Sequence, residues 1–261
     1  MAQVITITNQ KGGVGKTTTC SALIAGLHQR GARVLGIDLD PQGNLGFTLG
    51  LEIGAGYSMY DVLTRAHSIS EAISSTEFGD VIPSDVLLSA AEVEFTAPRR
   101  EFMLSEQIGL IEDRYDYIII DTPPALNILT INAYVASSGL IIPMEPEILS
   151  LVGLSQLRDT YETIQQSYNP NLRVLGILMN RFNKHYRLHQ DVLEMAGEVA
   201  AQMGSHVFST QIRRSVDVAT APAHGESVLT YRPESNPAKD FQYIIDVVAG
   251  SRFPRVNQDN F

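Results

Sequence analysis

The sequence predicts an α/β fold in which a doubly wound, mostly parallel sheet carries helices on both faces. Two observations favour this class. Short apolar segments rich in Val and Ile alternate along the chain with longer segments of helical spacing. The first strand and the first helix are joined by a glycine-rich loop, residues 9–16, which is typical of open parallel sheets that bind a ligand at this turn.

The strands are expected where β-branched and apolar residues run together between turn residues. They are residues 2–8, 33–38, 80–83, 117–120, 140–142 and 173–179. Most lack an alternating polar position, which is typical of strands that are covered by helices on both sides.

The helices are expected where apolar residues recur at helical spacing. They are residues 17–30, 57–75, 87–95, 99–114, 126–136, 150–168, 189–203 and 237–249. The first of them ends before Gly31, a favourable C-terminal cap. Residues 41–50 contain three glycines and are expected to form a loop.

Composition predicts a folded cytoplasmic protein. Of the 261 residues, 44% are hydrophobic and 18% are charged, which favours a packed core over disorder. Residues 1–250 are expected to form a single domain and residues 251–261 a loose tail. No run is apolar and long enough to cross a bilayer, and the first residues lack a secretory pattern. The single cysteine, Cys20, excludes an internal disulfide and disfavours an iron–sulfur cluster.

The net charge of −10 is unevenly distributed along the chain. Acidic residues are concentrated in residues 52–121. Residues 173–190 contain four basic residues and no acidic one, and Arg213 and Arg214 add a basic pair. An acidic total is therefore compatible with a local basic face.

Residues 11–18, Lys-Gly-Gly-Val-Gly-Lys-Thr-Thr, form the strongest motif. Glycines let backbone N–H groups converge on a phosphate, and the following helix directs its positive end at the same point. Lys16 is expected to reach the β- and γ-phosphates, and the Thr17 hydroxyl to ligate Mg²⁺. The sequence thus predicts a P-loop NTPase type of fold and a phosphate site formed by Lys11, Gly12, Gly13, Val14, Gly15, Lys16, Thr17 and Thr18.

This motif departs from the common phosphate loop, because Gln10 replaces its first glycine and Lys11 is an additional lysine. The pattern resembles the deviant Walker A loop of the ParA/MinD superfamily of ATPases, and Asn9-Gln10 resembles its ParA/Soj branch. The resemblance covers roughly residues 2–250. It implies an ATP hydrolase with ATP and Mg²⁺ as cofactors, in which Lys11 contacts phosphate across a homodimer that forms in the ATP state.

Three aspartates follow apolar strands and are expected at the same edge of the sheet. By resemblance, Asp38 and Asp121 support the metal, Asp121 as part of a Walker B element. Asp40 is by resemblance the residue required for hydrolysis, so the catalytic set is Lys11, Lys16 and Asp40. A capping role in the turn Asp-Pro-Gln-Gly is the alternative for Asp38 and Asp40.

Two further positions are assigned to the nucleotide by resemblance. Asn180 ends the strand 173–179 and matches an asparagine that bonds the adenine edge. Arg213 takes the place where the family's loop normally carries a proline after isoleucine. Residues 221–225, Ala-Pro-Ala-His-Gly, resemble a segment of Soj-like proteins.

The resemblance implies a nucleoid-associated partition protein that binds DNA without sequence preference and responds to a ParB-like activator. Lys184, Arg187, Arg213 and Arg214 are the candidate phosphate contacts on DNA. Asp217 occupies a position where Soj-like proteins tend to carry an arginine, which disfavours a contact there.

Two alternatives stay open. The chain could position a cargo other than DNA. It could also act at a membrane as MinD does, although residues 251–261 lack the basic amphipathic pattern of that branch, so no membrane contact is expected.

Overall fold

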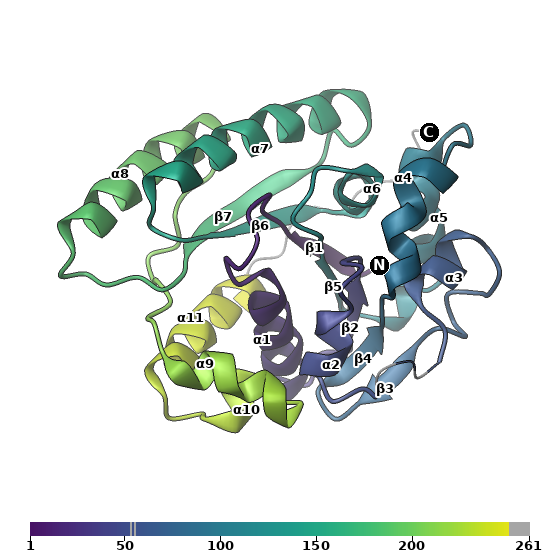
Figure 1. Cartoon of the computed structure of the whole chain (residues 1–261), viewed down its shortest axis with the longest axis horizontal. Coiled ribbons are helices and arrows are strands. Elements are labelled where there is room, and N and C mark those ends of the chain that lie inside the picture. Colours follow the sequence, from purple (N-terminus) through teal and green to yellow (C-terminus); the bar gives the residue numbers. More distant parts are fainter. Residues whose placement is uncertain (53, 55, 251–261) are drawn as a thin grey trace.

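The computed structural model describes residues 1–250 apart from residues 53 and 55, so the tail predicted at residues 251–261 lies outside the described part. In that part, seven strands form one sheet in the order β3-β4-β2-β5-β1-β6-β7 (Figure 1). The strands are β1 (Gln3–Ile7), β2 (Val34–Asp38), β3 (Ser74–Thr76), β4 (Gly79–Ile82), β5 (Tyr117–Asp121), β6 (Gly139–Met144) and β7 (Arg173–Met179).

All neighbouring strands are parallel except β3, which pairs with β4 in antiparallel direction at the sheet edge. The prediction of a mostly parallel sheet is confirmed. Strands β2 and β6 are buried along their whole length, and β1, β5 and β7 are buried from their second residue on. The continuous apolar runs in the sequence have this origin.

The α-helices differ widely in length. They are α1 (Lys16–Gln29), α2 (Asn44–Thr48), α3 (Met59–Leu63), α4 (Ala91–Glu94), α5 (Met103–Gly109), α6 (Ile128–Ala136), α7 (Ile148–Ser167), α8 (Arg187–Gln202), α9 (Val216–Thr220), α10 (Val228–Tyr231) and α11 (Asn236–Gly250). Short 3₁₀ turns are η1 (Val86–Ala90), η2 (Arg100–Phe102), η3 (Glu112–Arg114) and η4 (Ala221–His224).

The sheet separates two hydrophobic cores. Helices α6, α7 and α8 contribute to one core, and α1, α10 and α11 contribute to the other (Figure 1). Strand β5 supplies both, because Ile118 and Ile120 belong to the first core and Ile119 to the second. Helix α1 lies close to α11, since a Cβ at Gly26 would be 2.2 Å from the Ile245 side chain.

Two predicted segments were wrong. Residues 41–50 contain helix α2, whose Leu45 N–H donates to the Asp38 carboxylate at 2.9 Å. A tertiary hydrogen bond therefore stabilises a helix that glycines alone disfavour. Residues 57–75 form only the short helix α3 and strand β3, because the chain turns at Arg65 with a φ of 60°. Helices α9 and α10 were not predicted at all.

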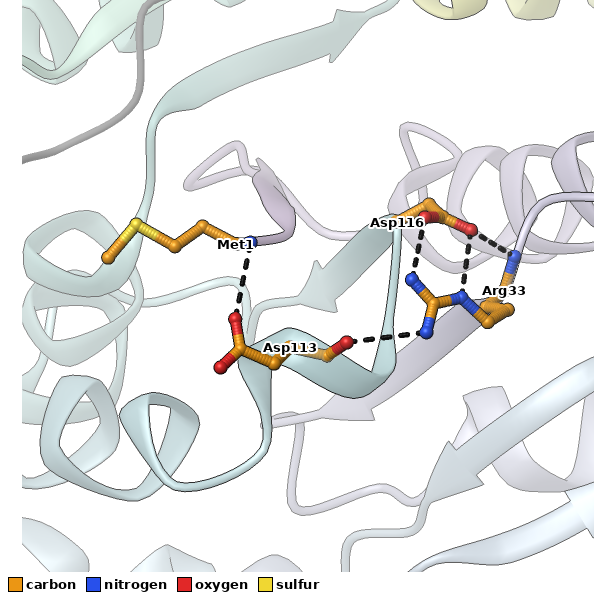
Figure 2. A network of polar contacts seen from close by, with 4 residues as sticks. All are labelled: Met1, Arg33, Asp113 and Asp116. Atoms are coloured by element: carbon orange, nitrogen blue, oxygen red, sulfur yellow. Dashed lines mark hydrogen bonds and ion pairs between the residues drawn. The ribbon is translucent and has the colours of Figure 1, made fainter.

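A polar network connects the amino ends of β2 and β5, at the end of these strands remote from the predicted phosphate loop (Figure 2). The Arg33 guanidinium donates to both carboxylate oxygens of Asp116, at 2.9 and 3.2 Å, and to the Asp113 carbonyl at 3.3 Å. The Met1 amine donates to the Asp113 carboxylate at 3.4 Å. The Arg33 guanidinium holds the pKa of Asp116 below its usual value. This network links the residues that directly precede β2 and β5.

Within residues 1–250 as described, none of the helices is both long and apolar enough to cross a lipid bilayer.

Candidate active site

The predicted phosphate loop lies at the carboxyl end of β1. Strand β1 has β5 on one side and β6 on the other, so the connections that leave these strands diverge and open a crevice. A cavity of about 860 Å³ occupies this position. Its lining brings together residues from the phosphate loop, the segment after β2, β7 and the α9 region: Gly12–Thr18, Asp40, Asn44, Pro124, Asn180, Arg181, Ile212–Val216, Val218, Ala219 and Phe241.

The loop has the backbone that its glycines predict. Gly13 and Gly15 have φ values of 74° and 93°, in the left-handed region that favours glycine. A Cβ at Gly15 would be 2.5 Å from the Asn180 amide nitrogen, which itself donates to the Val14 carbonyl at 2.6 Å. Asn9 fixes the start of the loop by donating to the Pro143 carbonyl at 2.8 Å and accepting from the Lys11 N–H at 2.9 Å.

Lys16 is the first residue of α1 and only 7% exposed. Its ammonium donates to the Lys11 carbonyl at 3.2 Å, which connects the end of the loop with its beginning. Burial lowers the pKa of Lys16, while Asp121 and Asp40 oppose this shift. The cavity therefore has a buried positive group at the N-terminus of a helix, which suits a phosphate.

Asp38 and Asp121 lie opposite each other at the ends of β2 and β5, where they are register partners. Asp38 is fully buried, and its two oxygens accept from the Asp40 and Leu45 N–H groups, both at 2.9 Å. Burial, together with the Asp121 carboxylate, raises its pKa. Asp38 thus anchors the segment that carries Asp40, a role that sequence reasoning had left as the alternative.

Asp121 is 1% exposed, and neither of its carboxylate oxygens has a hydrogen-bond partner in the structure. Burial raises its pKa to about 7, while the neighbouring Thr17 hydroxyl and Lys16 ammonium lower it. An unpartnered buried carboxylate is costly, and a cation would satisfy it. The described residues contain no cluster of three or more His, Cys, Asp or Glu side chains that could hold a metal. Thr17 and Asp121 offer a hydroxyl and a carboxylate, the oxygen donors that Mg²⁺ prefers, so these two residues would suit a Mg²⁺ ion that keeps several waters.

Asp40 is half-buried and lines the cavity. Its side chain accepts the Gln42 N–H at 3.1 Å, and its carbonyl accepts the Gly43 N–H at 2.9 Å, so the turn holds it rigidly. The structure brings Asp40 and Lys16 to one cavity, as the sequence predicted.

Lys11 is not among the residues that line the cavity. Its ammonium lies 2.5 Å from the Glu147 carboxylate, directly before α7. Both side chains are exposed, by 39% and 53%. Glu147 was not predicted, since nothing in the spacing of the sequence connects it with the loop.

Asn180 lines the cavity beside the phosphate loop, and its amide oxygen is buried without a partner. Next to it, the Arg213 guanidinium donates to both oxygens of Asp240, at 2.7 and 3.0 Å, and the Arg213 N–H donates to the same carboxylate at 3.0 Å. Asp240 is 7% exposed and was missed by sequence reasoning. A buried aspartate inside the apolar face of α11 is the signal that could have identified it.

The candidate DNA contacts do not all lie together. Lys184 and Arg187 are exposed where the chain enters α8, and they do not line the cavity. Arg214 is exposed at the cavity, whereas the Arg213 guanidinium is held by Asp240. Asp217 accepts from the Ser215 hydroxyl at 2.9 Å and lies 3.9 Å from the Arg232 guanidinium, which offsets its charge.

Residues 221–225 contact the segment after β2 through two glycines. Gly225 and Gly50 have φ values of 67° and 83°, and a Cβ at Gly225 would be 3.0 Å from the Gly50 Cα. The backbone at the end of η4 thus lies against the backbone that follows α2.

Comparison with known proteins identifies the family. An AAA domain family model matches residues 2–174. The sporulation initiation inhibitor protein Soj of Bacillus subtilis strain 168 is 39% identical over 255 residues, which cover 96% of this chain and 100% of Soj. The chromosome partitioning protein ParA of Caulobacter vibrioides (strain NA1000 / CB15N) is 40% identical over 237 residues, 88% of this chain and 87% of that protein.

Solved structures agree on the fold. The cobyrinic acid a,c-diamide synthase of Mycobacterium smegmatis, with a bound ATP analog and magnesium, is 32% identical with a TM-score of 0.83, over 95% of this chain and 94% of that one. The family resemblance that the phosphate loop predicted is thereby confirmed, as is the P-loop ATPase fold. The chain belongs to the ParA/Soj family of partitioning ATPases.

Proposed function

We propose that this protein is an ATP-dependent dimerising switch that binds DNA without sequence preference and positions plasmid or chromosome DNA together with a ParB-like activator. It would act in the cytoplasm, associated with the nucleoid. The observation that carries the proposal is the exposed Lys11, next to a complete phosphate cradle but outside the lining of its own cavity.

Several residues at or beside the cavity would act in phosphoryl transfer to water. Backbone N–H groups of Gly12–Thr18 and the Lys16 ammonium would neutralise the phosphates. Thr17 and Asp121 would hold Mg²⁺, which supplies charge neutralisation when bound, and Asp38 would support it through water. The similar M. smegmatis structure contains an ATP analog and magnesium, which supports this assignment. Asp40, held by its turn, would orient the attacking water.

The partner subunit would complete the site. Lys11 lies at the rim of the loop, where a second copy could bring its own nucleotide. Hydrolysis would then be slow in the monomer and would reset the dimer, so that the protein acts as a timer. Asn180, with a free amide oxygen, and the wall around Arg213 would contact the adenine.

DNA would contact the exposed basic residues Lys184, Arg187 and Arg214 through its phosphates. We expect Arg213 to contribute less, because two N–H groups of its guanidinium already donate to the Asp240 carboxylate. Arg232 adds a cation beside Asp217, at the position where relatives tend to carry arginine.

Binding of the ATP-bound protein to random duplex DNA over a salt series tests the proposal. We expect binding with ATP but not ADP, and affinity that falls steeply with salt. The double variant Lys184→Ala/Arg187→Ala should weaken binding and reduce the salt slope by about 2. Lys239→Ala, which removes a cation paired with Glu234 at 3.0 Å on α11, is the matched control. ATP-independent binding, or equal loss in both variants, would refute the DNA role.

One observation favours a second candidate function. An acid, Asp217, stands where Soj-like proteins tend to carry an arginine, which disfavours a DNA contact at that position and leaves open a relative that positions another cargo. Capture of partners by the ATP-bound protein in nuclease-treated extract distinguishes the two. A ParB-like protein supports DNA partition, whereas a scaffold of another assembly supports the alternative.

A further inference from the structure

A single ion pair connects the additional lysine of the phosphate loop with the segment before α7. Lys11 Nζ lies 2.5 Å from Glu147 Oε2. The backbone on both sides is held, since the Lys11 N–H donates to Asn9 and the Glu147 N–H donates to the Glu145 carbonyl at 2.8 Å. Neither side chain lines the cavity.

The neighbouring carboxylate is already occupied. The Arg181 guanidinium forms an ion pair with Glu145, which is largely buried at 13% exposure of its side chain. Glu147 is therefore the acidic group near Lys11 that has no other cation at salt-bridge distance among the described residues. The Lys11 ammonium also holds the pKa of Glu147 below its usual value, so the carboxylate is charged at physiological pH.

We propose that Glu147 is a positioning residue that holds Lys11 in cis in the nucleotide-free monomer and must release it before a second copy can use it. The proposal rests on the proposed function, in which Lys11 acts across a dimer. Dimer formation then breaks one such pair in each subunit. Glu147 thereby sets how much protein is required for the ATP-bound dimer, without touching nucleotide itself.

The substitution Glu147→Gln tests this role, because it preserves size and removes the charge. Dimerisation is measured by sedimentation equilibrium with Mg²⁺ and a non-hydrolysable ATP analogue. An exposed pair of this kind changes an equilibrium by up to about fivefold, so two pairs should lower the dimer dissociation constant by roughly 2- to 30-fold. The difference from the wild-type protein should shrink at high salt.

Glu162→Gln is the matched control. Glu162 lies on α7, the helix that Glu147 precedes, has a similar exposure of 48%, and is 3.8 Å from Arg158 instead of Lys11. It should leave dimerisation unchanged. A Glu147→Gln protein that dimerises as the wild type does, or more weakly, would overturn the proposal.

A second measurement separates this inference from the function on which it rests. Labelling of Lys11 by an amine-reactive reagent, without nucleotide, is compared with labelling of Lys239 by mass spectrometry. Glu147→Gln should raise the labelling of Lys11 alone. If the wild-type protein does not dimerise with the analogue, the proposed function fails. If Lys11 labelling is the same in both proteins, the restraint itself is absent.

Discussion

Asp121 has surroundings that are costly for a charged group. Its carboxylate is buried at the end of β5 without a hydrogen-bond partner, and burial raises its pKa to about 7. Buried carboxylates normally have partners, so this one indicates a site prepared for a cation. Lys16, with its pKa lowered by burial, is the complementary case, and a bound phosphate would satisfy it.

Gly15→Ala should destabilise the fold and abolish nucleotide binding. The substitution places a side chain at a φ of 93° and a Cβ 2.5 Å from Asn180, which should cost about 2 kcal/mol or more of unfolding free energy. Urea denaturation of the nucleotide-free protein measures this. Gly12→Ala is the control, because nothing lies within 4 Å of its Cβ position and its φ is not positive. Equal losses in both variants would contradict the explanation.

Asp40→Ala should uncouple nucleotide binding from hydrolysis. The residue is half-buried and held by its own turn, so its loss should leave the fold and the phosphate cradle intact. We expect phosphate release to fall by about 10²-fold or more and the ATP-bound dimer to persist. Phosphate-release kinetics and light scattering measure the two effects. Hydrolysis at the wild-type rate would exclude Asp40 from the reaction.

Several residues of the site could be predicted from the sequence, because the motif itself encodes the geometry. Glycines, Lys16 and Asp121 follow their strands at fixed distances along the chain, and a parallel sheet gathers strand ends at one edge. Glu147 and Asp240 could not be predicted in this way. Their partners Lys11 and Arg213 are 136 and 27 residues distant in sequence, and only the fold brings them together.

At the scale of elements, length decides what the sequence reveals. Long helices such as α7 and α11 bury one face and repeat their pattern over several turns, so they were predicted within two residues of their ends. Helix α2 and strand β3 have five and three residues, too few for a period to be visible. Both depend on tertiary contacts, α2 on Asp38 and β3 on pairing with β4.

Gly197→Ala should stabilise α8. The glycine lies in the interior of the helix, and an added Cβ would meet nothing within 4 Å. Alanine should therefore raise the free energy of unfolding by about 0.5–1 kcal/mol through backbone entropy alone. Thermal and urea unfolding test this. Gly204→Ala, also in open space but at a φ of 64°, should instead lower stability.

Asp116→Asn should weaken the start of β2 and β5 in a pH-dependent manner. Arg33 lowers the folded-state pKa of Asp116, so its stabilisation is present above the unfolded pKa of about 3.9 and is lost as pH falls through the folded value. The pair is exposed, so we expect a melting temperature lower by about 1–4 °C at pH 7. The difference from the wild-type protein should vanish near pH 2. A difference in melting temperature that grows toward acid pH would contradict the assignment of this stabilisation to the charged Asp116–Arg33 pair.

At the scale of the whole molecule, the sheet fixes where chemistry can occur. Two cores hold the strands rigidly from both faces, and the loops at their carboxyl ends converge on one cavity. Lys16, which lines this cavity, and the neighbouring buried Asp121 are charged groups whose burial costs stability. Binding of a magnesium nucleotide should therefore stabilise the entire fold.

Mg²⁺-ATP should raise the melting temperature of the protein. At a free ligand concentration of 100 times Kd, linkage adds about 2.7 kcal/mol, or about 5–10 °C for a chain of this size. Removal of Mg²⁺ with EDTA should eliminate most of the shift, because the Asp121 carboxylate then repels the phosphates. Differential scanning fluorimetry measures both. The same shift with and without EDTA would exclude Asp121 from metal binding.

The contact between Gly50 and Gly225 has a mechanical consequence. Main chain lies on main chain there, and no side chain can change rotamer to absorb a displacement. Gly50 belongs to the segment that continues from Asp40, where hydrolysis would be sensed. Gly225 belongs to the segment that continues from the exposed Arg214. A rearrangement around the γ-phosphate would thus be transmitted to the outer surface by rigid backbone movement, because the two segments must shift together.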